Sequence, residues 1–571
     1  MARPSIEIPD GYCPKDPILV RPSSPTPRHT IYLSNLDDQP FLRFSIKYVY
    51  VYRRSVAAEA LAASLGKALV EYYPLAGRLV RSPEGGREKL VVNCNAQGAV
   101  FAEAHSILTA DEFLRGAARP NRSWRKLLYE PTDEERSFID VPPLLVQVTY
   151  LSCGGMILCT AISHCLCDAI GTANFLHAWA LLTAKPSAAV PVAVVHDRRL
   201  LKPREPPRIE FPHPEFSSQT QECYSIFQLL LSQPLTPVSI TFTAAQILHL
   251  KKQCVPSLKC TSFEALAWHV WRAWVKALDP PPALRVKLLF SVNVRRRLRP
   301  ELPGGYFGNA FVMACAETFA AELSGSSARG GIMLVQAAKE GVRDGQVRSV
   351  VDLLEERWTR PDLSASLVIS PWTKLGLEEV DFGEGRPLHM GPMTSEIYCL
   401  FLPVVGDLHA FTLLVSVPQG IAERFHHCCL IQQPDESYMN REMVDKKVAQ
   451  NPITSMSRSN AKETKKNHQN TSSDSPEMDW LAVVIGGGDV DEAETAEENG
   501  GDQSNREFAR RSRMRKQMQL EELTAEVSRL QRDKSQLVSI LCLAAQQCTA
   551  WRLRTPSSVR ESLEQILLNA P

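Results

Sequence analysis

The front of the chain alternates two kinds of hydrophobic pattern. Apolar runs such as "RFSIKYVYVYRR" and "LLVQVTYLSCGGMILCTAI" have the β-branched and aromatic content of strands. Stretches such as "SVAAEALAASLGKALVEYY" repeat apolar residues at helical spacing. This mixture continues from residue 1 to about residue 430, and it predicts α/β architecture.

The pattern changes abruptly after Leu430. Residues 431–500 are polar, nearly free of aromatic residues and without an apolar period, so we expect a disordered linker. A basic stretch with leucines seven apart follows in residues 501–555 and predicts a long helix, before a tail of residues 556–571. At 571 residues the chain is too long for one hydrophobic core, so several domains are expected.

Bulk composition narrows the class of protein. A net charge of +1 with 44% hydrophobic and 22% charged residues is typical of an ordinary soluble globular protein. The N-terminus lacks a basic region followed by an apolar run, and no stretch approaches eighteen apolar residues, so we expect neither a signal peptide nor a membrane span. The fifteen scattered cysteines indicate reduced thiols in the cytosol or nucleus, and their spacing predicts no metal site.

One short segment, "AISHCLCDAIG", combines chemistry-bearing residues. His164 and Asp168 stand four apart directly after an apolar strand-like run. Taken alone, this spacing also fits a buried histidine hydrogen-bonded to a nearby carboxylate. The other segments of the chain decide between these interpretations.

Five further segments accompany this motif in a known order: "YYPLAGRL", "VNCNAQGAVFAEA", "TSFEALAWHVWRA", "VNVRRRLRPELPGGYFGNA" and "SPWTKLGLEEVDFGEGRP". Together they closely resemble the BAHD family of plant acyl-CoA-dependent acyltransferases over nearly all of residues 1–430. The resemblance implies two chloramphenicol-acetyltransferase-like α/β domains, residues 1–200 and 201–430, with a channel between them and His164 at its middle. It implies acyl-CoA as co-substrate, a small alcohol or amine of plant metabolism as acceptor, and no permanently bound cofactor.

Acyl transfer explains why such an enzyme needs a histidine. A hydroxyl is a poor nucleophile at neutral pH unless a base removes its proton, and positioned base catalysis contributes ~10²- to 10⁴-fold. An imidazole with a pKa of about 6.5 suits this task. By resemblance, His164 is the base, and Asp168 pairs with Arg295 as a structural clamp of the site.

The resemblance also assigns the segment that contains "DFGEG". It implies a loop that lies away from the histidine and holds the domain arrangement needed for CoA binding, carried by Asp381, Phe382, Gly383 and Gly385. Trp372 matches a position on the acceptor side, with an ordinary core tryptophan as the alternative.

Two positions depart from the family pattern. Glu384 replaces an aromatic residue, a loss of about 2 to 3 kcal/mol of apolar burial if that site is buried. Ala169 stands where glycine is common, and a left-handed backbone there would be strained. Neither change removes the base.

The C-terminal basic stretch begins "NREFARRSRMRKQ". Arg513 follows Asn505 after seven residues, and a leucine heptad follows at Leu523, Leu530 and Leu537. This register resembles the bZIP transcription factors, which implies duplex DNA and a bZIP heterodimer as partners. The residues expected to face the major groove are Asn505, Ala509, Ser512 and Arg513.

The bZIP-like segment has its own departures. Phe508 replaces a small residue of the basic region, and Lys534 occupies a seam position that usually carries asparagine. Paired lysines there repel each other, which disfavours a homodimer and favours a heterodimer.

Three hypotheses for the whole chain remain at this point. The first is an acyl-CoA-dependent acyltransferase of class EC 2.3.1.-, joined to a bZIP-like helix. The second is a DNA-binding regulator that keeps a non-catalytic acyltransferase-like scaffold, and the third is an artefactual joining of two separate reading frames. The presence of His164 favours the enzyme, which we expect in the cytoplasm, or in the nucleus where the tail functions.

Overall fold

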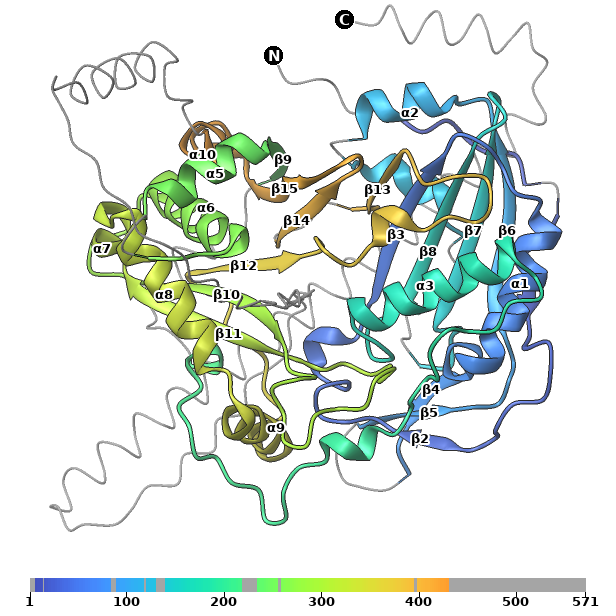
Figure 1. Cartoon of the computed structure of the whole chain (residues 1–571), viewed down its shortest axis with the longest axis horizontal. Coiled ribbons are helices and arrows are strands. Elements are labelled where there is room, and N and C mark those ends of the chain that lie inside the picture. The colour runs from blue at the N-terminus through green and yellow to red at the C-terminus, as the bar shows by residue number, and fades with distance from the viewer. Residues whose placement is uncertain are drawn as a thin grey trace, which may run out of the picture. The chain divides into compact units, whose positions relative to one another are not determined.

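The computed structural model describes residues 6–13, 15–83, 89–117, 120–129, 139–217, 234–254, 258–394 and 398–430. The predicted linker of 431–500, the bZIP-like segment of 501–555 and the tail of 556–571 lie outside these residues. Within the described residues, two six-stranded sheets and a three-stranded sheet are interleaved with helices, which confirms the predicted α/β class (Figure 1).

The first large sheet comes mainly from the N-terminal half of the front segment. Its strand order is β1-β6-β7-β8-β3-β13, with β6 and β7 parallel and the other neighbours antiparallel. The strands are β1 (Ile18–Val20), β3 (Ser45–Tyr52), β6 (Ala99–Ser106), β7 (Leu144–Leu151), β8 (Met156–Ser163) and β13 (His389–Pro392). A small antiparallel sheet, β2 (Thr30–Tyr32), β5 (Leu90–Asn93) and β4 (Arg78–Arg81), stands beside it.

Helices cover both faces of this sheet. On β3, Tyr48, Tyr50 and Tyr52 face the cluster of α1 (Ala58–Glu71) and α3 (Ala169–Ala184). The intervening Val49 and Val51 face α2 (Ala110–Gly116). This alternation is the period-two pattern of a strand that is buried on both faces, and all eight residues of β8 are buried.

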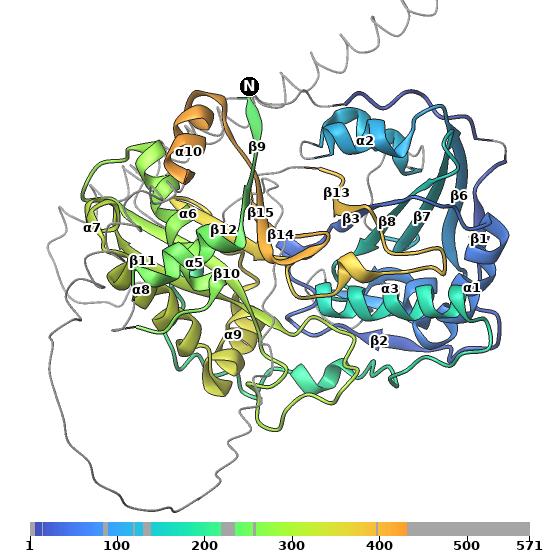
Figure 2. The same ribbon diagram turned by 45° about the horizontal axis from the view of Figure 1, so that its top comes forward.

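The second large sheet belongs to the C-terminal half. Its order is β11-β10-β12-β14-β15-β9, with β10, β12 and β14 parallel to one another. The strands are β9 (Leu235–Phe242), β10 (Arg285–Asn293), β11 (Phe311–Phe319), β12 (Ser366–Pro371), β14 (Cys399–Val404) and β15 (Asp407–Pro418). Figure 2 shows that this sheet and its helices lie beside the first sheet.

The helices of the second half are α5 (Ala244–Lys252), α6 (Ser262–Leu278), α7 (Ala320–Gly325), α8 (Ala328–Gly341), α9 (Asp344–Arg357) and α10 (Ala422–Cys429). On β10, Leu288 and Phe290 pack into the large cluster of α6 and α8, whereas Leu289 points to the opposite face, where it packs with Phe311. Helix α6 begins with a capping box between Thr261 and Glu264, as its sequence signature favours.

The division between the two halves is not a simple cut at residue 200. Strand β13, which comes from the predicted domain of 201–430, pairs antiparallel with β3 of the first sheet. The chain therefore returns to the first half after β12 before it completes the second sheet. This crossing ties the two halves together through backbone hydrogen bonds.

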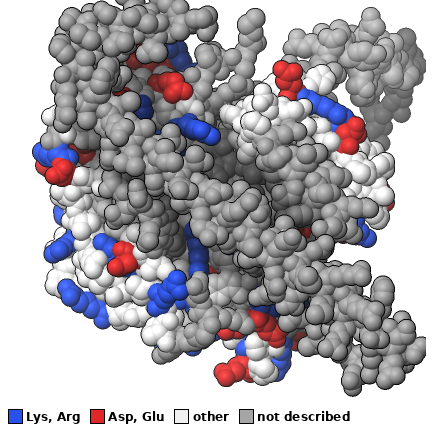
Figure 3. All heavy atoms as spheres, turned by 180° about the vertical axis from the view of Figure 1, so that it is seen from behind, with Lys and Arg blue, Asp and Glu red and all other residues white. Residues whose placement is uncertain are grey.

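The described surface mixes charges of both signs. Seen from behind, Lys and Arg side chains lie among Asp and Glu side chains (Figure 3), as the net charge of +1 leads one to expect. None of the described helices is both long and apolar enough to cross a membrane. Across the same residues, no group of three or more His, Cys, Asp or Glu side chains is placed to hold a metal ion.

Candidate active site

His164 stands at the end of β8, between the two halves. Its backbone N–H donates to the carbonyl oxygen of Phe44 at 2.8 Å, which continues the β3–β8 ladder by one residue. The imidazole lies between two aromatic rings, Phe44 at 5.4 Å and Phe311 at 5.9 Å between ring centroids. Because Phe311 opens β11 of the second sheet, both halves of the molecule contribute to the surroundings of this side chain.

The imidazole of His164 is set up to be neutral. The residue is 2% exposed, and burial lowers its pKa below the ordinary value. Its Nδ1 has no hydrogen-bond partner among the described residues. A neutral imidazole can accept a proton, so the side chain fits the role of a general base.

Asp168 points away from the imidazole and into a buried ion pair with Arg295. The Arg295 Nη1 and Nη2 atoms donate to the two carboxylate oxygens at 2.7 and 2.9 Å, and the N–H of Ala310 adds a third bond at 3.1 Å. Burial alone would raise the pKa of Asp168, but the charge and hydrogen bonds of Arg295 hold it below its usual value. The bidentate pair joins the start of α3 to the segment after β10, at the position that the sequence predicted.

Asp168 also starts α3. As N-cap it accepts a hydrogen bond from the N–H of Gly171 at 3.0 Å. Ala169 is the first residue of this helix and is not among the described residues with positive φ. The strain considered for Ala169 therefore does not arise, because a helical first turn accommodates alanine.

The loop of Asp381, Phe382, Gly383 and Gly385 lies at the other end of α3. An added Cβ on Gly383 would approach Ala184, the last residue of that helix, to 3.2 Å. Sixteen helical residues rise about 24 Å, which is the distance along α3 between this loop and the motif of His164 and Asp168.

Asp381 and Phe382 fix the shape of this loop. The Asp381 carboxylate accepts hydrogen bonds from the N–H groups of Gly383 and Gly385, at 2.7 and 2.9 Å, and both glycines have positive φ near 106°. The Phe382 ring is buried against Trp179 and Tyr52.

Glu384 is exposed, with 45% of its side chain accessible, and its carboxylate lies 3.8 Å from Arg54. The considered loss of apolar burial at this position therefore does not apply, because the site is not buried.

Trp372 is 3% exposed and packs against Tyr48, with ring centroids 4.8 Å apart. Its backbone N–H donates to the carbonyl oxygen of Phe401 at 2.7 Å. This is the position of a tryptophan in the core next to β3, the alternative that the sequence left open. Its proposed contact with the acceptor stays a prediction.

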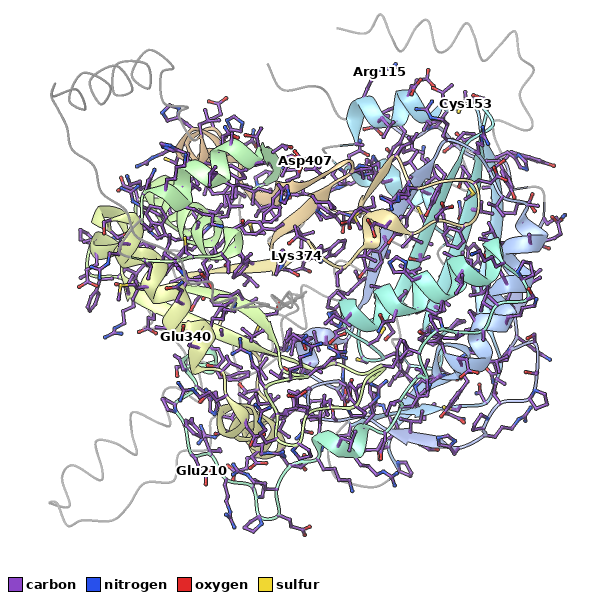
Figure 4. All side chains as sticks on the ribbon, viewed as in Figure 1. Arg115, Cys153, Glu210, Glu340, Lys374 and Asp407 are labelled. Atoms are coloured by element: carbon purple, nitrogen blue, oxygen red, sulfur yellow. The ribbon has the colours of Figure 1, made fainter. Side chains whose placement is uncertain are left out.

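A cavity of about 590 Å³ opens beside the segment that follows Trp372. It lies between α5, the first turn of α6, and the β14–β15 turn. Basic and hydroxyl side chains on its wall are Lys251, Lys374, His409, Ser262 and Thr373. Figure 4 labels Lys374, after the end of β12, and Asp407, at the start of β15, which both belong to this wall.

Sequence reasoning missed a buried polar group beside the motif, formed by Asp37, Arg198 and Asn309. Asn309 donates to the backbone carbonyl of His164, and Arg198 to that of Leu166. Asn309 stands within the quoted "GGYFGNA" segment, and Asp37 within "LSNLDDQ". The type of residue gave no signal, since asparagine and aspartate in loop-like segments are typical of turns.

Comparisons with known proteins agree with this geometry. The Transferase family model matches residues 15–427. The chain is 35% identical over 420 residues to the fatty alcohol:caffeoyl-CoA acyltransferase of Arabidopsis thaliana, covering 72% of this chain and 96% of that protein. It is 35% identical to the omega-hydroxypalmitate O-feruloyl transferase of the same plant, covering 72% and 91%, and 33% identical to the benzyl alcohol O-benzoyltransferase of Petunia hybrida, covering 66% and 82%.

Two solved structures share the fold. Vinorine synthase superposes with a TM-score of 0.55 at 22% identity, covering 72% of this chain and 95% of that one. TRI101 of F. graminearum, complexed with coenzyme A and T-2 mycotoxin, gives 0.59 at 15% identity, covering 72% and 98%. The matching family model and the curated relatives show that this chain belongs, over residues 15–427, to the Transferase family, the BAHD acyltransferases.

Proposed function

We propose that the protein transfers the acyl group of an acyl-CoA to the hydroxyl of an alcohol, with His164 as general base. The observation that carries this proposal is the neutral, buried imidazole of His164 between the two halves. In the reaction, the imidazole takes the proton of the hydroxyl while its oxygen attacks the thioester carbonyl. The C–S bond then breaks, and the imidazolium returns the proton to the leaving CoA thiolate.

Asp168 and Arg295 hold the site in this proposal and do not touch the reacting atoms. Both carboxylate oxygens of Asp168 are engaged by Arg295, the N–H of Gly171 and the N–H of Ala310. A carboxylate so occupied is a poor second base, because its pKa is lowered and its lone pairs already accept from these donors.

The cavity beside Trp372 suits the nucleotide end of CoA. Lys251 and Lys374 supply positive charge for its phosphates, and Ser262 adds a hydroxyl at the first turn of α6. Leu248 and Leu408, which are 51% and 66% exposed, give the rim an apolar surface for the adenine ring.

The carboxylates in the same wall oppose an anion less than their number implies. Burial raises the pKa of Glu378, and Glu379 is paired with Arg386 at 3.3 Å. Asp407 accepts hydrogen bonds from the N–H groups of His409 and Ala410. Glu378 and Glu379 therefore offset less of the positive charge of the two lysines than their number implies, whereas Asp407 keeps its negative charge.

The acceptor is proposed to be an alcohol with an apolar body. The named relatives act on a fatty alcohol, omega-hydroxypalmitate and benzyl alcohol. In this chain the groups around His164 are the rings of Phe44 and Phe311, and the apolar cluster of Phe311 continues over Leu289, Met313 and Val368. We propose Trp372 as a further wall on the acceptor side. An amine acceptor is the second choice, since the same base would serve it.

The test is a panel assay with the full chain. Caffeoyl-, feruloyl-, benzoyl- and acetyl-CoA are each combined with 1-hexadecanol, omega-hydroxypalmitate and benzyl alcohol, and ester and free CoA are measured. We expect turnover with at least one pair and none with His164→Ala. Absence of ester with every pair from well-folded protein would contradict the proposed function.

A second proposal concerns the C-terminal segment, which lies outside the described residues. The spacing of Asn505, Arg513 and the leucines supports a bZIP-like helix that binds duplex DNA as a heterodimer. Phe508 and Lys534 favour weak binding by the segment alone and tighter binding with a bZIP partner. The enzyme would be cytoplasmic, and nuclear where this segment acts.

A DNA-binding titration of the full chain at fixed salt, with and without a plant bZIP protein, tests the second proposal. Tight sequence-specific binding without a partner would contradict the heterodimer. Equal weakness in both conditions would contradict DNA binding itself.

A further inference from the structure

The turn from His164 to Asp168 is held at three points by side chains from other segments. Asp168 is held by Arg295, as described above. The carbonyl oxygen of His164 accepts from Asn309 Nδ2 at 2.8 Å. The carbonyl oxygen of Leu166 accepts from Arg198 Nη2 at 2.8 Å. Two of the three points are therefore independent of the ion pair.

Asn309 is itself fixed by Asp37. The Oδ1 atom of Asp37 accepts from the backbone N of Asn309 at 2.8 Å and from its Nδ2 at 3.0 Å. The Oδ2 atom accepts from the backbone N and the hydroxyl of Ser34, at 3.1 and 2.6 Å. All three residues are 5% exposed or less. Both Nδ2 hydrogens of Asn309 thus go to acceptors, which fixes the orientation of the amide.

Arg198 completes the group. Its side chain is 1% exposed, and Nη1 lies 4.0 Å from Asp37 Oδ1. Its guanidinium lies over the rings of Tyr306 and Phe307, at 5.4 and 5.8 Å. An added Cβ on Gly308 would overlap Nη1 at 1.7 Å, so this glycine lets Arg198 reach the turn. Asp37 is the carboxylate that both Asn309 and Arg198 face.

The imidazole ring of His164 is held less firmly than the backbone of this turn. Nδ1 of His164 has no hydrogen-bond partner among the described residues. Besides its two aromatic neighbours, the ring lies close enough to the Asn309 side chain for that amide to raise its pKa against the effect of burial. The direction of the Cα–Cβ bond of His164, which the adjoining peptide groups determine, therefore sets where the imidazole stands. A misplacement of 1 Å at a reacting group costs ~10²-fold in rate.

We propose that Asp37 and Asn309 are positioning residues for the base, which act through the backbone carbonyl of His164. They form a second clamp, separate from Asp168 and Arg295, and Arg198 balances the buried charge of Asp37. The inference rests on the proposed function, because it assigns these residues a task in the same reaction.

The test compares Asn309→Ala with Ser349→Ala. Ser349 is an equally buried polar residue on α9. It is hydrogen-bonded to His213 at 2.8 Å and accepts from the backbone N–H of Glu210 at 3.1 Å, and neither residue belongs to the site. Melting temperature, kcat and the KM for acyl-CoA are measured for both. We expect Asn309→Ala to lower kcat at least tenfold with KM within twofold, and Ser349→Ala to keep kcat. Equal kcat in both variants, with wild-type turnover intact, would overturn the positioning role while the proposed function stands.

Two further variants cover a failure of Asn309→Ala to fold. Asn309→Ser keeps a hydrogen-bond donor on a shorter side chain. Asp37→Asn keeps an acceptor oxygen but removes the negative charge. We expect both to lower kcat by less than Asn309→Ala would. A crystal structure of Asn309→Ser gives a readout independent of turnover: the imidazole of His164 should be displaced, and an unmoved ring would overturn the proposal even where no acceptor is turned over.

Discussion

The two ends of α3 are stabilised by different kinds of interaction. At its N-terminal end, Asp168 is held by charge-assisted hydrogen bonds from Arg295, inside a region with almost no solvent. At its C-terminal end, the Phe382 ring packs on Trp179, and Glu384 of the same loop lies 3.8 Å from the exposed Arg54. Hydrogen bonds and ion pairs have directions, whereas apolar packing tolerates small shifts. Hydrogen bonds are also present toward the C-terminal end, where Thr183 bonds Ser64 at 2.8 Å, so what distinguishes the end beside the base is its buried ion pair.

The two kinds of interaction also differ in how they contribute to the free energy of unfolding. A buried ion pair contributes little net stability compared with apolar residues of the same shape, but removal of one partner costs several kcal/mol. A buried aromatic ring stabilises through the area it removes from water. We therefore expect variants at the N-terminal end of α3 to affect turnover as well as stability, and variants at the C-terminal end to affect stability alone.

The largest effect should come from His164→Ala. Removal of the base is expected to lower kcat ~10²- to 10⁴-fold. Because the lost ring is buried between Phe44 and Phe311, the melting temperature should also fall, so kcat is measured well below it. The matched control is His269→Ala, a buried histidine whose ring bonds the carbonyl of Cys429 on the far side of the second sheet. That variant should keep kcat. A fall in kcat smaller than tenfold in His164→Ala would show that another group acts as base.

Asp168→Asn should follow in size. Arg295 would keep a buried charge without its carboxylate, at a cost of about 3 to 5 kcal/mol in the free energy of unfolding, measured by denaturant titration. Because Asp168 is also the N-cap of α3, we expect kcat to fall together with the free energy of unfolding. The double variant Asp168→Leu with Arg295→Met removes both charges and should recover part of the lost stability. Unchanged stability together with lost turnover would instead place Asp168 in the proton transfer.

Phe382→Ala tests the opposite end of α3. The ring is 2% exposed and contacts Trp179 and Tyr52, so its removal should lower the free energy of unfolding by about 3 kcal/mol. Measured well below the melting temperature, kcat should stay within threefold of the wild type. A selective loss of kcat with intact stability would remove the contrast between the two ends.

The pH dependence of kcat/KM tests the proposed protonation state of His164. Burial lowers the pKa of His164, so its neutral form persists to lower pH than in an exposed histidine. Activity requires that neutral form, and it should therefore fall only below pH 6.5, by up to tenfold per pH unit. A pH profile of kcat/KM in the wild type measures this limb. An acid limb centred above pH 6.5 would mean that the imidazole is not desolvated in the working enzyme.

The sequence predicted those features that depend on a recognisable motif or on a hydrophobic period. The period of two in β3 and the helical spacing of α1 follow from the chain itself, and the ion pair of Asp168 with Arg295 was implied by the family resemblance. The return of β13 to the first sheet did not follow, because four residues have no period to recognise. The clamp of Asp37 and Asn309 joins residues 272 positions apart through their amide and carboxylate groups, and no local pattern encodes such a pairing.

The smallest effect is expected at Glu384, next to the strongly stabilising Phe382. The sequence alone allowed a loss of apolar burial at this position, but the structure leaves 45% of the Glu384 side chain and 76% of the Arg54 side chain exposed, with 3.8 Å between their charged atoms. Exposed pairs of this kind contribute ~0 to 1 kcal/mol, and surface substitutions away from special features stay within about 0.5 kcal/mol.

Glu384→Ala and Glu384→Trp should therefore both leave kcat within twofold and the free energy of unfolding within about 0.5 kcal/mol, as measured by denaturant titration. Phe382→Ala serves as the positive control, since it changes the neighbouring residue of the same loop. If Glu384→Trp instead stabilised the protein by more than about 1 kcal/mol, the added ring would have found apolar surface beside Phe382. The C-terminal end of α3 would then hold an unfilled apolar site, and the departure of this chain from its family at Glu384 would carry a measurable cost.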